Sequence, residues 1–368
     1  MQVLMVYIEP APYILDLIRV MGKEHPGIGL RVFFITSSCT QVWGSKLDDG
    51  ISQLLPVGKL AAARKLFAEI RKGDFDWLHL AGWGHPLMMF ALLVGGAFRR
   101  KISVESDTQL PQPLAGVKER LKKLLYPWLF SLADILFPGG ARQREYFRHY
   151  GVPDYKIRIA QMTVDVRRIM AMAEGFHAGR VGIRESMGLK VDDLVFVYVG
   201  RLESYKGIRL LLEAFAHIGL DGARLLLVGD GSERVLVDAA AANDGRIRYL
   251  GRRNFEGVFA AFSISDVAIV PSEFEPWGLV VNEAMAAGLP VIATDRVGAV
   301  DDLVIDGDTG IIVPAGNSNK LQEAMCCLAR DSQLRQRMGS AALELIQRWR
   351  KEDEAERLVR GWQAGGAS

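Results

Sequence analysis

The chain has 368 residues, of which 49% are hydrophobic and 24% are charged, a composition that is typical of folded proteins and excludes a disordered chain. This length exceeds what one hydrophobic core usually organises, so we expect two domains. The formal net charge of +2 hides an asymmetry that indicates domains with different partners: residues 1–165 carry 21 lysines and arginines against 15 acidic residues, whereas residues 166–368 carry 24 against 28.

Short apolar stretches alternate with helical patterns along the whole chain. In the first half they predict strands at 3–8, 31–35, 77–80, 102–105 and 135–137, with helices at 13–22, 60–72 and 86–98. In the second half they predict strands at 195–199, 224–228, 247–250, 267–270, 291–293 and 311–313, with helices at 208–217, 233–242, 280–287 and 320–328. This alternation is typical of parallel, doubly wound α/β sheets, and the number of strands favours two of them. The region 165–193 has no strand pattern, so we expect it to be a linker.

Two cations lie in the segment that follows the strand at 195–199. Residues 200–207 read Gly-Arg-Leu-Glu-Ser-Tyr-Lys-Gly, and we call them the basic loop. Because open α/β sheets bind ligands at the carboxyl ends of their strands, Arg201 and Lys206 are placed to bind a diphosphate, with Gly200 and Gly207 leaving the backbone free. The alternative is a solvated basic turn without a ligand.

Two carboxylates flank the turn that follows the strand at 267–270. Residues 271–278, which we call the acidic loop, contain Glu275, and Glu283 lies eight positions further on in the predicted helix. Both carboxylates can face one pocket, into which the first amides of the helix and the positive end of its dipole also point. This combination suits a ligand rich in hydroxyls and phosphates, such as a nucleotide-sugar. Gly229 and Asp230 follow a third strand of the same half; alone this turn is weak support, but three such loops are unlikely by chance.

The order of these motifs resembles glycosyltransferase family 4. The motifs are Gly-Arg-Leu-x3-Lys-Gly, Val-Gly-Asp-Gly, Asp-Val at 266–267, Pro-Ser at 271–272, Glu-x7-Glu and Glu-Ala-Met-Ala-x-Gly-x-Pro-Val. The resemblance is specific across 195–315 and only general in the first half, through Asp-Ile-Leu-Phe-Pro at 134–138. It implies the GT-B fold, with two Rossmann-like domains that face a cleft. Residues 1–165 would bind the acceptor, residues 166–345 the nucleotide-sugar, and the helix at 346–368 would return to the first domain.

The resemblance also implies an activity and a donor site. The activity is retaining transfer of a hexose-type sugar from a UDP- or GDP-sugar to a glycan or lipid-linked acceptor in cell-surface polysaccharide or glycolipid synthesis, without a cofactor or metal. Arg201 and Lys206 match the pair that holds the diphosphate, Glu283 matches the carboxylate on the ribose, and Glu275 matches the carboxylate beside the donor sugar. The remaining donor-binding positions are Gly200, Gly229, Asp230, Trp277, Gly278 and Leu279.

The role expected of Arg201 and Lys206 also has a physical reason that does not depend on the family. Breaking the anomeric bond sends negative charge onto the diphosphate, and fixed cations beside a helix start stabilise that charge best in the transition state. Trp277 stands where the family commonly has a phenylalanine, so it is the first residue of this segment to examine for the choice of sugar.

The first half departs from the family pattern where the acceptor would bind. The first loop, which often contains glycines in the family, is here Glu-Pro-Ala-Pro at 9–12, and the usual His-Asp after the fourth strand is Glu105-Ser106-Asp107. We therefore expect Asp107 or Glu105 to orient the acceptor hydroxyl, with help from Glu9. Of these three, Asp107 is also expected to be a catalytic residue. The alternative is that these carboxylates cap a helix or bind a loop.

Histidines and a pair of aspartates offer further candidates in the first half. His85 precedes a predicted helix start and is the better cleft residue, whereas His79, within a strand, is expected to be a core residue. Asp74 and Asp76 have the spacing of a metal site, but they precede a strand instead of following one, so we expect them to be solvated and the protein to bind no metal.

A basic, aromatic helix is expected at 117–128. Apolar residues fall on one stripe at 117, 121, 124, 125 and 128, and the other face carries Lys118, Arg120, Lys122 and Lys123. Such a helix suits an anionic membrane surface, although a core-facing helix with a wet basic side gives the same pattern. Since the family often uses lipid-linked acceptors, we expect peripheral binding at the inner face of the cell membrane. Nucleic acid is not an expected partner.

The spacing of the cysteines and the pattern of the first residues indicate the cellular compartment. Cys39, Cys326 and Cys327 lack disulfide or metal spacing, and no signal-peptide pattern or membrane-spanning apolar run is present, so we expect a cytoplasmic protein. Two rival functions stay open. One is a GT-B sugar-nucleotide epimerase, and the other is a nicotinamide-dependent oxidoreductase or non-catalytic nucleotide-binding protein, for which the Gly-x-Gly-x-x-Gly pattern is missing.

Overall fold

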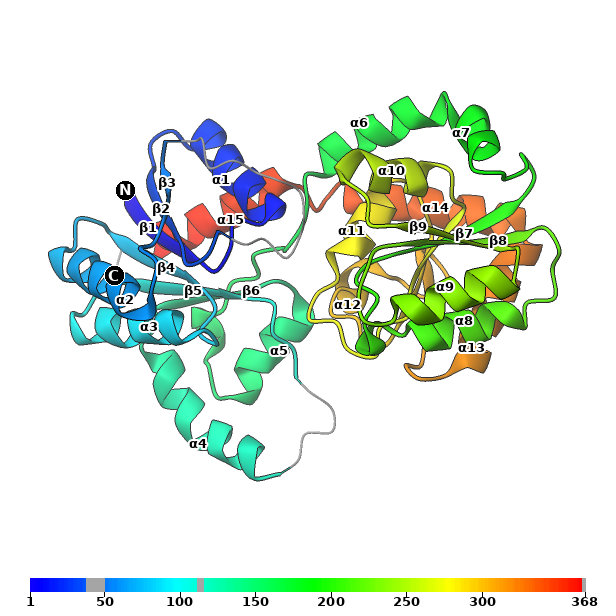
Figure 1. The fold of residues 1–368 in the computed structure, drawn as a ribbon. Helices are drawn as coiled ribbons and strands as arrows, with labels where there is room; N and C mark the ends of the chain where they lie inside the picture. Colours follow the sequence, from blue (N-terminus) through cyan, green and yellow to red (C-terminus); the bar gives the residue numbers. More distant parts are fainter. Residues whose placement is uncertain (38–49, 111–115, 366–368) are drawn as a thin grey trace. The chain divides into compact units, whose positions relative to one another are not determined.

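The computed structural model describes residues 1–37, 50–110 and 116–365 (Figure 1). The chain divides into two compact units, one formed by Met1–Thr163 with Lys351–Ser368 and the other by Val164–Arg350. Each unit contains one parallel, six-stranded sheet with helices on both faces, so the α/β, doubly wound class predicted from the sequence is confirmed. The chain leaves the first unit two residues before the expected boundary at 165 and returns to it at Lys351.

The first unit has the strand order β3-β2-β1-β4-β5-β6. Its strands are β1 Gln2–Tyr7, β2 Gly29–Phe34, β3 Ser52–Leu54, β4 Trp77–Ala81, β5 Ile102–Ser106 and β6 Ile135–Pro138. Its helices are α1 Pro12–Glu24, α2 Lys59–Lys72, α3 Pro86–Ala97, α4 Val117–Ser131, α5 Ala141–His149 and α15 Lys351–Ala364. The edge strand β3 was not predicted, because its three residues carry no buried apolar pattern.

The central strand β1 shows why both faces of this sheet are covered. Leu4 and Val6 join the apolar cluster formed with α2 and α3, whereas Val3, Met5 and Tyr7 join the cluster formed with α1 and α15. Successive side chains of a strand point to opposite faces, so an uninterrupted apolar strand requires a helical layer on each side. The returning helix α15 supplies part of one layer.

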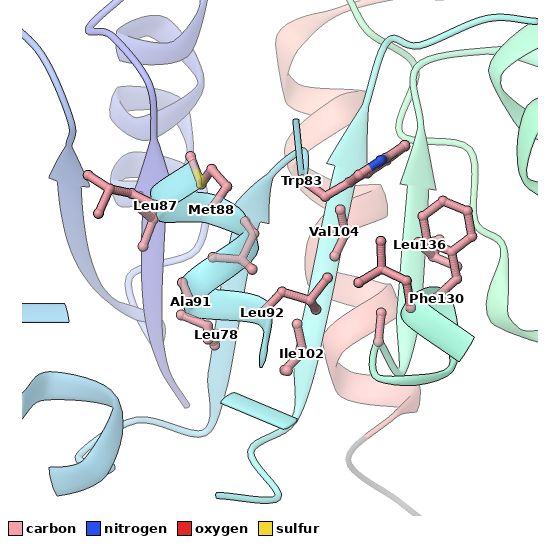
Figure 2. Close-up of a cluster of buried hydrophobic side chains, with 14 of the residues drawn as sticks. Leu78, Trp83, Leu87, Met88, Ala91, Leu92, Ile102, Val104, Phe130 and Leu136 are labelled. Atoms are coloured by element: carbon pink, nitrogen blue, oxygen red, sulfur yellow. The ribbon is translucent and has the colours of Figure 1, made fainter. Parts of the chain in front are cut away.

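The apolar run at 86–98 forms α3 and packs on this sheet. Figure 2 shows side chains of α3, among them Met88 and Leu92, lying near side chains of the neighbouring strand β5, among them Ile102. Within the described ranges, no helix is both long enough and apolar enough to cross a membrane. Cys326 and Cys327 are free thiols, and Cys39 lies outside the described residues.

The second unit has the strand order β12-β11-β10-β7-β8-β9, which repeats the connectivity of the first. Its strands are β7 Leu194–Val199, β8 Ala223–Val228, β9 Ile247–Gly251, β10 Val267–Val270, β11 Val291–Thr294 and β12 Gly310–Val313. Its helices are α6 Val166–His177, α7 Arg180–Ser186, α8 Ile208–Ala216, α9 Arg234–Asn243, α10 Phe255–Ser263, α11 Leu279–Ala286, α12 Val300–Leu303, α13 Ser318–Arg330 and α14 Ser332–Ile346.

The expected linker at 165–193 is wrong. Most of this region forms α6 and α7, which belong to the second unit, and α6 packs on α10 and α11. Buried residues recur on α6 at helical spacing, at Val166, Ile169 and Ala173. The absence of a strand pattern was correctly observed, but it reflected helices and not a linker.

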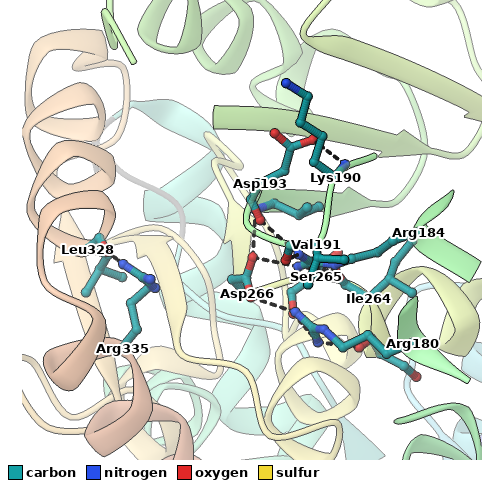
Figure 3. Close-up of polar contacts among 12 residues, drawn as sticks. Arg180, Arg184, Lys190, Val191, Asp193, Ile264, Ser265, Asp266, Leu328 and Arg335 are labelled. Atoms are coloured by element: carbon teal, nitrogen blue, oxygen red, sulfur yellow. Dashed lines mark hydrogen bonds and ion pairs between the residues drawn. The ribbon is translucent and has the colours of Figure 1, made fainter. Parts of the chain in front are cut away.

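Arg184 of α7 fastens this helical pair to the second sheet (Figure 3). Its buried guanidinium donates to the carbonyl oxygens of Ile264, Val191 and Asp193 at 2.7–2.9 Å and to the carboxylate of Asp266 at 2.9 Å. Asp266 in turn accepts the backbone N–H of Val195 at the start of β7. All five N–H groups of Arg184 are therefore used, which is what a buried guanidinium requires.

We expect Arg184→Met to lower the free energy of unfolding by about 3 kcal/mol, because it leaves several buried acceptors and the Asp266 carboxylate without this donor. The urea midpoint of the full chain measures the effect. Arg348→Met is the matched control, since the Arg348 side chain is 70% exposed and makes only a helical ion pair with Glu344, which contributes about 0.5 kcal/mol. Equal midpoints for the two variants would contradict the structural role of Arg184.

Candidate functional site

The second sheet reverses its winding between β7 and β10. These strands are neighbours, but β8 and β9 continue from β7 on one side while β11 and β12 continue from β10 on the other. Doubly wound sheets bind ligands at the carboxyl ends of the strands at this point. Here β7 leads into the basic loop and β10 leads into the acidic loop.

The two loops meet through an ion pair. Lys206 Nζ is hydrogen-bonded to Glu275 Oε2, and both side chains are only 13–14% exposed. Ser272 Oγ donates to the same carboxylate oxygen at 3.5 Å. Two candidates that lie 69 residues apart in the sequence are thus in direct contact.

Gly207 lets the loops approach so closely. Its φ of 73° is left-handed, and a Cβ atom there would lie 2.0 Å from the carbonyl oxygen of Pro271 at the end of β10. Glu273 N–H also donates to the Tyr205 carbonyl oxygen at 2.8 Å. A side chain at position 207 would push the basic loop away from the acidic loop, so glycine is needed at this position.

Arg201 is the second cation of the basic loop. Its side chain is exposed, and its guanidinium carbon lies 5.6 Å from the centre of the Tyr205 ring, which is also 5.6 Å from Lys206 Nζ. Within the described residues it has no carboxylate partner. Tyr205 therefore lies beside both cations, although the sequence motif treats its position as variable, and sequence reasoning missed it.

The β8 loop supports the basic loop from the other side. Gly229 has a φ of 141°, and a Cβ atom there would lie 1.8 Å from the Gly200 carbonyl oxygen. The Asp230 carbonyl oxygen accepts the Leu202 N–H at 2.9 Å, and Asp230 Oδ1 accepts the N–H of Gly231 at 2.9 Å. These contacts shape the turn beside the basic loop, so Gly229 and Asp230 are placed to support its backbone.

The start of α11 follows the acidic loop directly. Gly278 has a left-handed φ of 97°, and no side chain of the described residues caps the helix that begins at Leu279. Glu275 is held by its backbone, whose N–H donates to the Arg296 carbonyl oxygen at 3.2 Å and whose carbonyl oxygen accepts the Gly298 N–H at 2.9 Å. The arrangement leaves a helix start with its positive dipole end beside the Lys206–Glu275 pair.

Glu283 lies on α11 and is half-buried. Burial raises the pKa of its carboxyl from 4.5 to about 8. Among the described residues its side chain has no hydrogen-bond or ion-pair partner, which is costly for a desolvated carboxylate. A ligand hydroxyl at this position would supply the missing partner.

The Trp277 side chain lies in the interior of the second unit. Trp277 is only 1% exposed, its indole N–H donates to Asn282 Oδ1 at 3.0 Å, and its ring stacks on Trp349 with a centroid distance of 5.7 Å. The side chain anchors the acidic loop in the interior of the second unit. The sequence alone does not show whether an aromatic residue next to a glycine in a loop contacts a ligand or packs in the interior.

The first unit brings three of its acidic candidates together. Burial raises the pKa of the Tyr13 hydroxyl, and the nearby carboxylates of Asp107, Glu105 and Glu9 raise it further, as does Glu354. These carboxylates therefore lie near enough to act electrostatically on one tyrosine at the start of α1. Asp107 is exposed, and Glu9 and Glu105 are half-buried.

The histidine expectations have mixed outcomes. His85 Nδ1 accepts the Leu87 N–H at 3.2 Å, so this ring caps α3, a role that the sequence analysis did not assign to it. His79 is fully buried within β4, as expected for a core residue, but it also contacts Glu105.

The Asp-x-Asp pair has structural contacts. Asp74 pairs with Lys72 at 2.6 Å, and Asp76 Oδ2 accepts the Gln2 N–H at 2.7 Å. Across residues 1–37, 50–110 and 116–365, no group of three or more His, Cys, Asp or Glu side chains is arranged to hold a metal ion.

Helix α4 exposes the apolar stripe that the sequence predicted. Its apolar members are between 49% and 81% exposed, namely Val117, Leu121, Leu124, Leu125 and Trp128. Lys118, Arg120 and Lys123 are exposed on the same helix. The alternative of a core-facing stripe is therefore wrong, because burial begins only at Leu129.

Comparisons with known sequences support a family assignment. Residues 181–345 match the family model described as "Glycosyl transferases group 1". The D-inositol 3-phosphate glycosyltransferase of Corynebacterium glutamicum is 28% identical over 284 residues, 74% of this chain and 65% of that protein. The phosphatidyl-myo-inositol mannosyltransferase of Mycobacterium leprae is 35% identical over 176 residues, 47% of each. The chain thus spans less than two thirds of the length of either relative.

Solved structures match over the whole chain. The Anabaena protein HepE in complex with UDP has a TM-score of 0.78 at 20% identity, covering 99% of this chain and all of that one. The sucrose-phosphate synthase of Thermosynechococcus elongatus has a TM-score of 0.78 at 20% identity, with full coverage of both chains. At this identity the likeness shows a shared fold.

We expect Glu283→Gln to change how stability depends on pH. The folded chain holds the Glu283 proton more tightly than the unfolded chain, with a pKa of about 8 against 4.5, so the contribution of this carboxyl to stability is present below pH 4.5 and is lost as pH rises to about 8. The urea midpoint of the variant should therefore rise relative to that of the unmodified protein between pH 5 and pH 9.

Glu354, whose pKa is also about 8, is present in both proteins and cancels in this difference. Glu256→Gln, at an exposed position of the same unit, reports the general effect of removing one carboxylate. A midpoint difference for Glu283→Gln that does not change with pH would show that burial does not perturb this carboxyl.

Proposed function

Because residues 181–345 match the group 1 glycosyltransferase model and the chain has the GT-B fold, we propose that it transfers a hexose-type sugar from a nucleotide-diphosphate donor to a glycan or lipid-linked acceptor. The second unit binds the donor and the first unit binds the acceptor. The proposal includes retention of the anomeric configuration, which NMR of the product reads directly. The product would belong to cell-surface polysaccharide or glycolipid synthesis.

The observation that carries the proposal is the contact between the basic and acidic loops at the point where the second sheet reverses. Lys206 and Arg201 bring positive charge to the place where the α11 start is left without a side-chain cap. A departing diphosphate develops negative charge, and fixed cations and amides stabilise it without reorganisation. Glu275 and Glu283 are acceptors for the hydroxyls of the sugar and the ribose.

The nature of the donor follows from the same charges. Arg201, Lys206 and the helix dipole supply the positive charge that a divalent cation supplies elsewhere, so the proposal requires no metal, and the assay should contain excess chelator. The UDP complex of HepE makes UDP-sugars the first donors to test, followed by GDP-sugars.

The acceptor side of the proposal includes a membrane surface. A relative is named a phosphatidyl-myo-inositol mannosyltransferase, which supports a lipid-linked acceptor. The exposed stripe of α4 places Leu124 and Trp128 among exposed cations, a combination that inserts into the interface of an anionic bilayer. We propose that α4 binds this surface peripherally, with its apolar stripe in the lipid and its cations on the headgroups.

We expect Lys206→Ala and Arg201→Ala each to lower turnover by about 100- to 1,000-fold, because each removes a charge that stabilises the leaving diphosphate. Turnover is measured as product mass after incubation of UDP- or GDP-sugars with extracted lipid-linked acceptors. Arg209→Ala is the matched control, since Arg209 lies on α8 just after the basic loop, and its side chain is 70% exposed and paired with Glu233.

Near-normal turnover in both alanine variants would contradict the role of the basic loop. Consumption of the nucleotide-sugar without any acceptor, with an isomeric sugar-nucleotide as the product, would instead establish the epimerase alternative.

We expect Leu124→Glu to weaken binding to vesicles that contain phosphatidylglycerol by about tenfold or more, because burial of a leucine in lipid contributes about 1.5–3 kcal/mol. Flotation of the full chain with these vesicles, and with vesicles of phosphatidylcholine alone, measures binding. Leu60→Glu on α2 is the control, since Leu60 is 66% exposed but lies outside the basic helix. Failure of the unmodified protein to float would refute the peripheral-membrane proposal.

A further inference from the structure

A buried chain of hydrogen bonds runs through the first sheet and ends on Glu105. Trp362 of α15 directs its indole N–H at Ser103 Oγ on β5, at 2.9 Å. Ser103 Oγ lies 3.0 Å from His79 Nδ1 on β4, and His79 Nε2 lies 3.2 Å from Glu105 Oε2. Trp362, Ser103 and His79 are all fully buried, whereas the Glu105 side chain is 15% exposed.

The chemistry of the end groups sets the direction of the protons. An indole N–H can only donate, so Ser103 Oγ accepts from Trp362, and an ionised carboxylate can only accept, so His79 Nε2–H donates to Glu105. A serine hydroxyl that accepts one hydrogen bond still has its own proton to donate, and we assign this proton to His79 Nδ1, which corresponds to an imidazole protonated at Nε2 and not at Nδ1. All bonds in the chain point toward Glu105.

The chain of hydrogen bonds holds one carboxylate oxygen of Glu105, Oε2, and leaves the other oxygen, Oε1, without a bond from it. Tyr7 Oη–H also donates to Oε2, at 3.4 Å, so both donors converge on the same carboxylate oxygen. Within the described ranges Oε1 has no hydrogen-bond partner. Glu105 is the penultimate residue of β5, at the carboxyl end of the sheet, which is the edge where α/β sheets bind ligands.

We propose that Glu105 Oε1 accepts the hydrogen bond of the acceptor hydroxyl, and that His79, Ser103 and Trp362 are positioning residues that hold this carboxylate in place. The inference rests on the proposed function and names the residue that binds the acceptor. A carboxylate whose orientation is fixed before the ligand arrives loses little freedom on binding, so its charge-assisted hydrogen bond is stronger.

The other candidates of the first unit are less suited to this role. His85 caps α3, and Glu354 is buried in a pair with Lys351, whose Nζ lies 2.5 Å from its carboxylate and 2.6 Å from the Thr163 carbonyl oxygen. The same Lys351 contacts fasten the start of α15, whose later Trp362 begins the hydrogen-bond chain. Acceptor binding thereby depends on the docking of the last helix.

The first test is Glu105→Gln, which keeps the shape of the side chain and removes its charge. We expect the acceptor KM to rise about 10- to 100-fold, measured as sugar transfer to the extracted lipid-linked glycan fraction, while the affinity for UDP in isothermal titration stays unchanged. Glu24→Gln, an exposed change at the end of α1 in the same unit, is the control and should alter neither quantity.

The second test measures which ring nitrogen of His79 carries the proton. Long-range ¹H–¹⁵N NMR of the full chain, with His79 assigned by the loss of its signals in His79→Gln, should show the form protonated at Nε2. Trp362→Phe keeps an aromatic ring but removes the N–H that orients the Ser103 hydroxyl. Ser103 can then turn and accept from His79, so forms protonated at Nδ1 should appear and the acceptor KM should rise about tenfold. A purely structural role of Trp362 would not move the site of protonation.

Two results would overturn the inference, namely an unchanged acceptor KM in Glu105→Gln or protonation of His79 at Nδ1 in the unmodified protein. Neither would affect the proposed function, since transfer by the unmodified protein and UDP binding are measured independently. Absence of both transfer and UDP binding in the unmodified protein would instead contradict the proposed function itself.

Discussion

The Lys206–Glu275 ion pair is the contact on which the organisation of the second unit's site depends. It joins loops that leave the two central strands of the sheet, and it forms only because Gly207 allows the basic loop to lie against the end of β10. An ion pair held this way keeps a cation and an acceptor in a partly desolvated position without a ligand. A diphosphate can then take the place of Glu275 beside Lys206, and a sugar hydroxyl can take the place of Lys206 beside Glu275. The site is therefore organised before a ligand binds.

Net charge and site charge have opposite signs in the two halves of the chain. Residues 166–368 have an excess of acids, yet the loops that follow β7 present two cations, whereas the basic residues 1–165 gather Glu9, Glu105 and Asp107 around Tyr13. The excess basic charge of the first half includes the cations of α4, which are separate in sequence from the acidic candidates. Domain charge therefore predicts a surface partner better than it predicts the chemistry of a binding site.

The sequence predicted most of the sheet because uninterrupted apolar strands between helices permit few other arrangements. It did not predict the roles of Trp277 and His79, because these are decided by partners that lie far away in the chain. Trp277 is buried by Trp349, and His79 gains its polar role through Ser103 and Glu105. The helices α6 and α7 were missed for a different reason, since their buried positions are few and one of them is an arginine.

Two arginines of the second unit show how a structural side chain differs from one that awaits a ligand. Arg184 is buried and uses all five of its N–H groups, so removing it can only expose unsatisfied acceptors. Arg201 is exposed, lies over the Tyr205 ring, and has no carboxylate partner in the described part of the chain. Glu283 repeats the second pattern with the opposite charge, since burial raises the pKa of a carboxyl that has no described partner. A cation without a counterion and a carboxyl with a raised pKa thus follow the two central strands of one sheet, and a ligand that carries phosphates and hydroxyls would supply a partner to each.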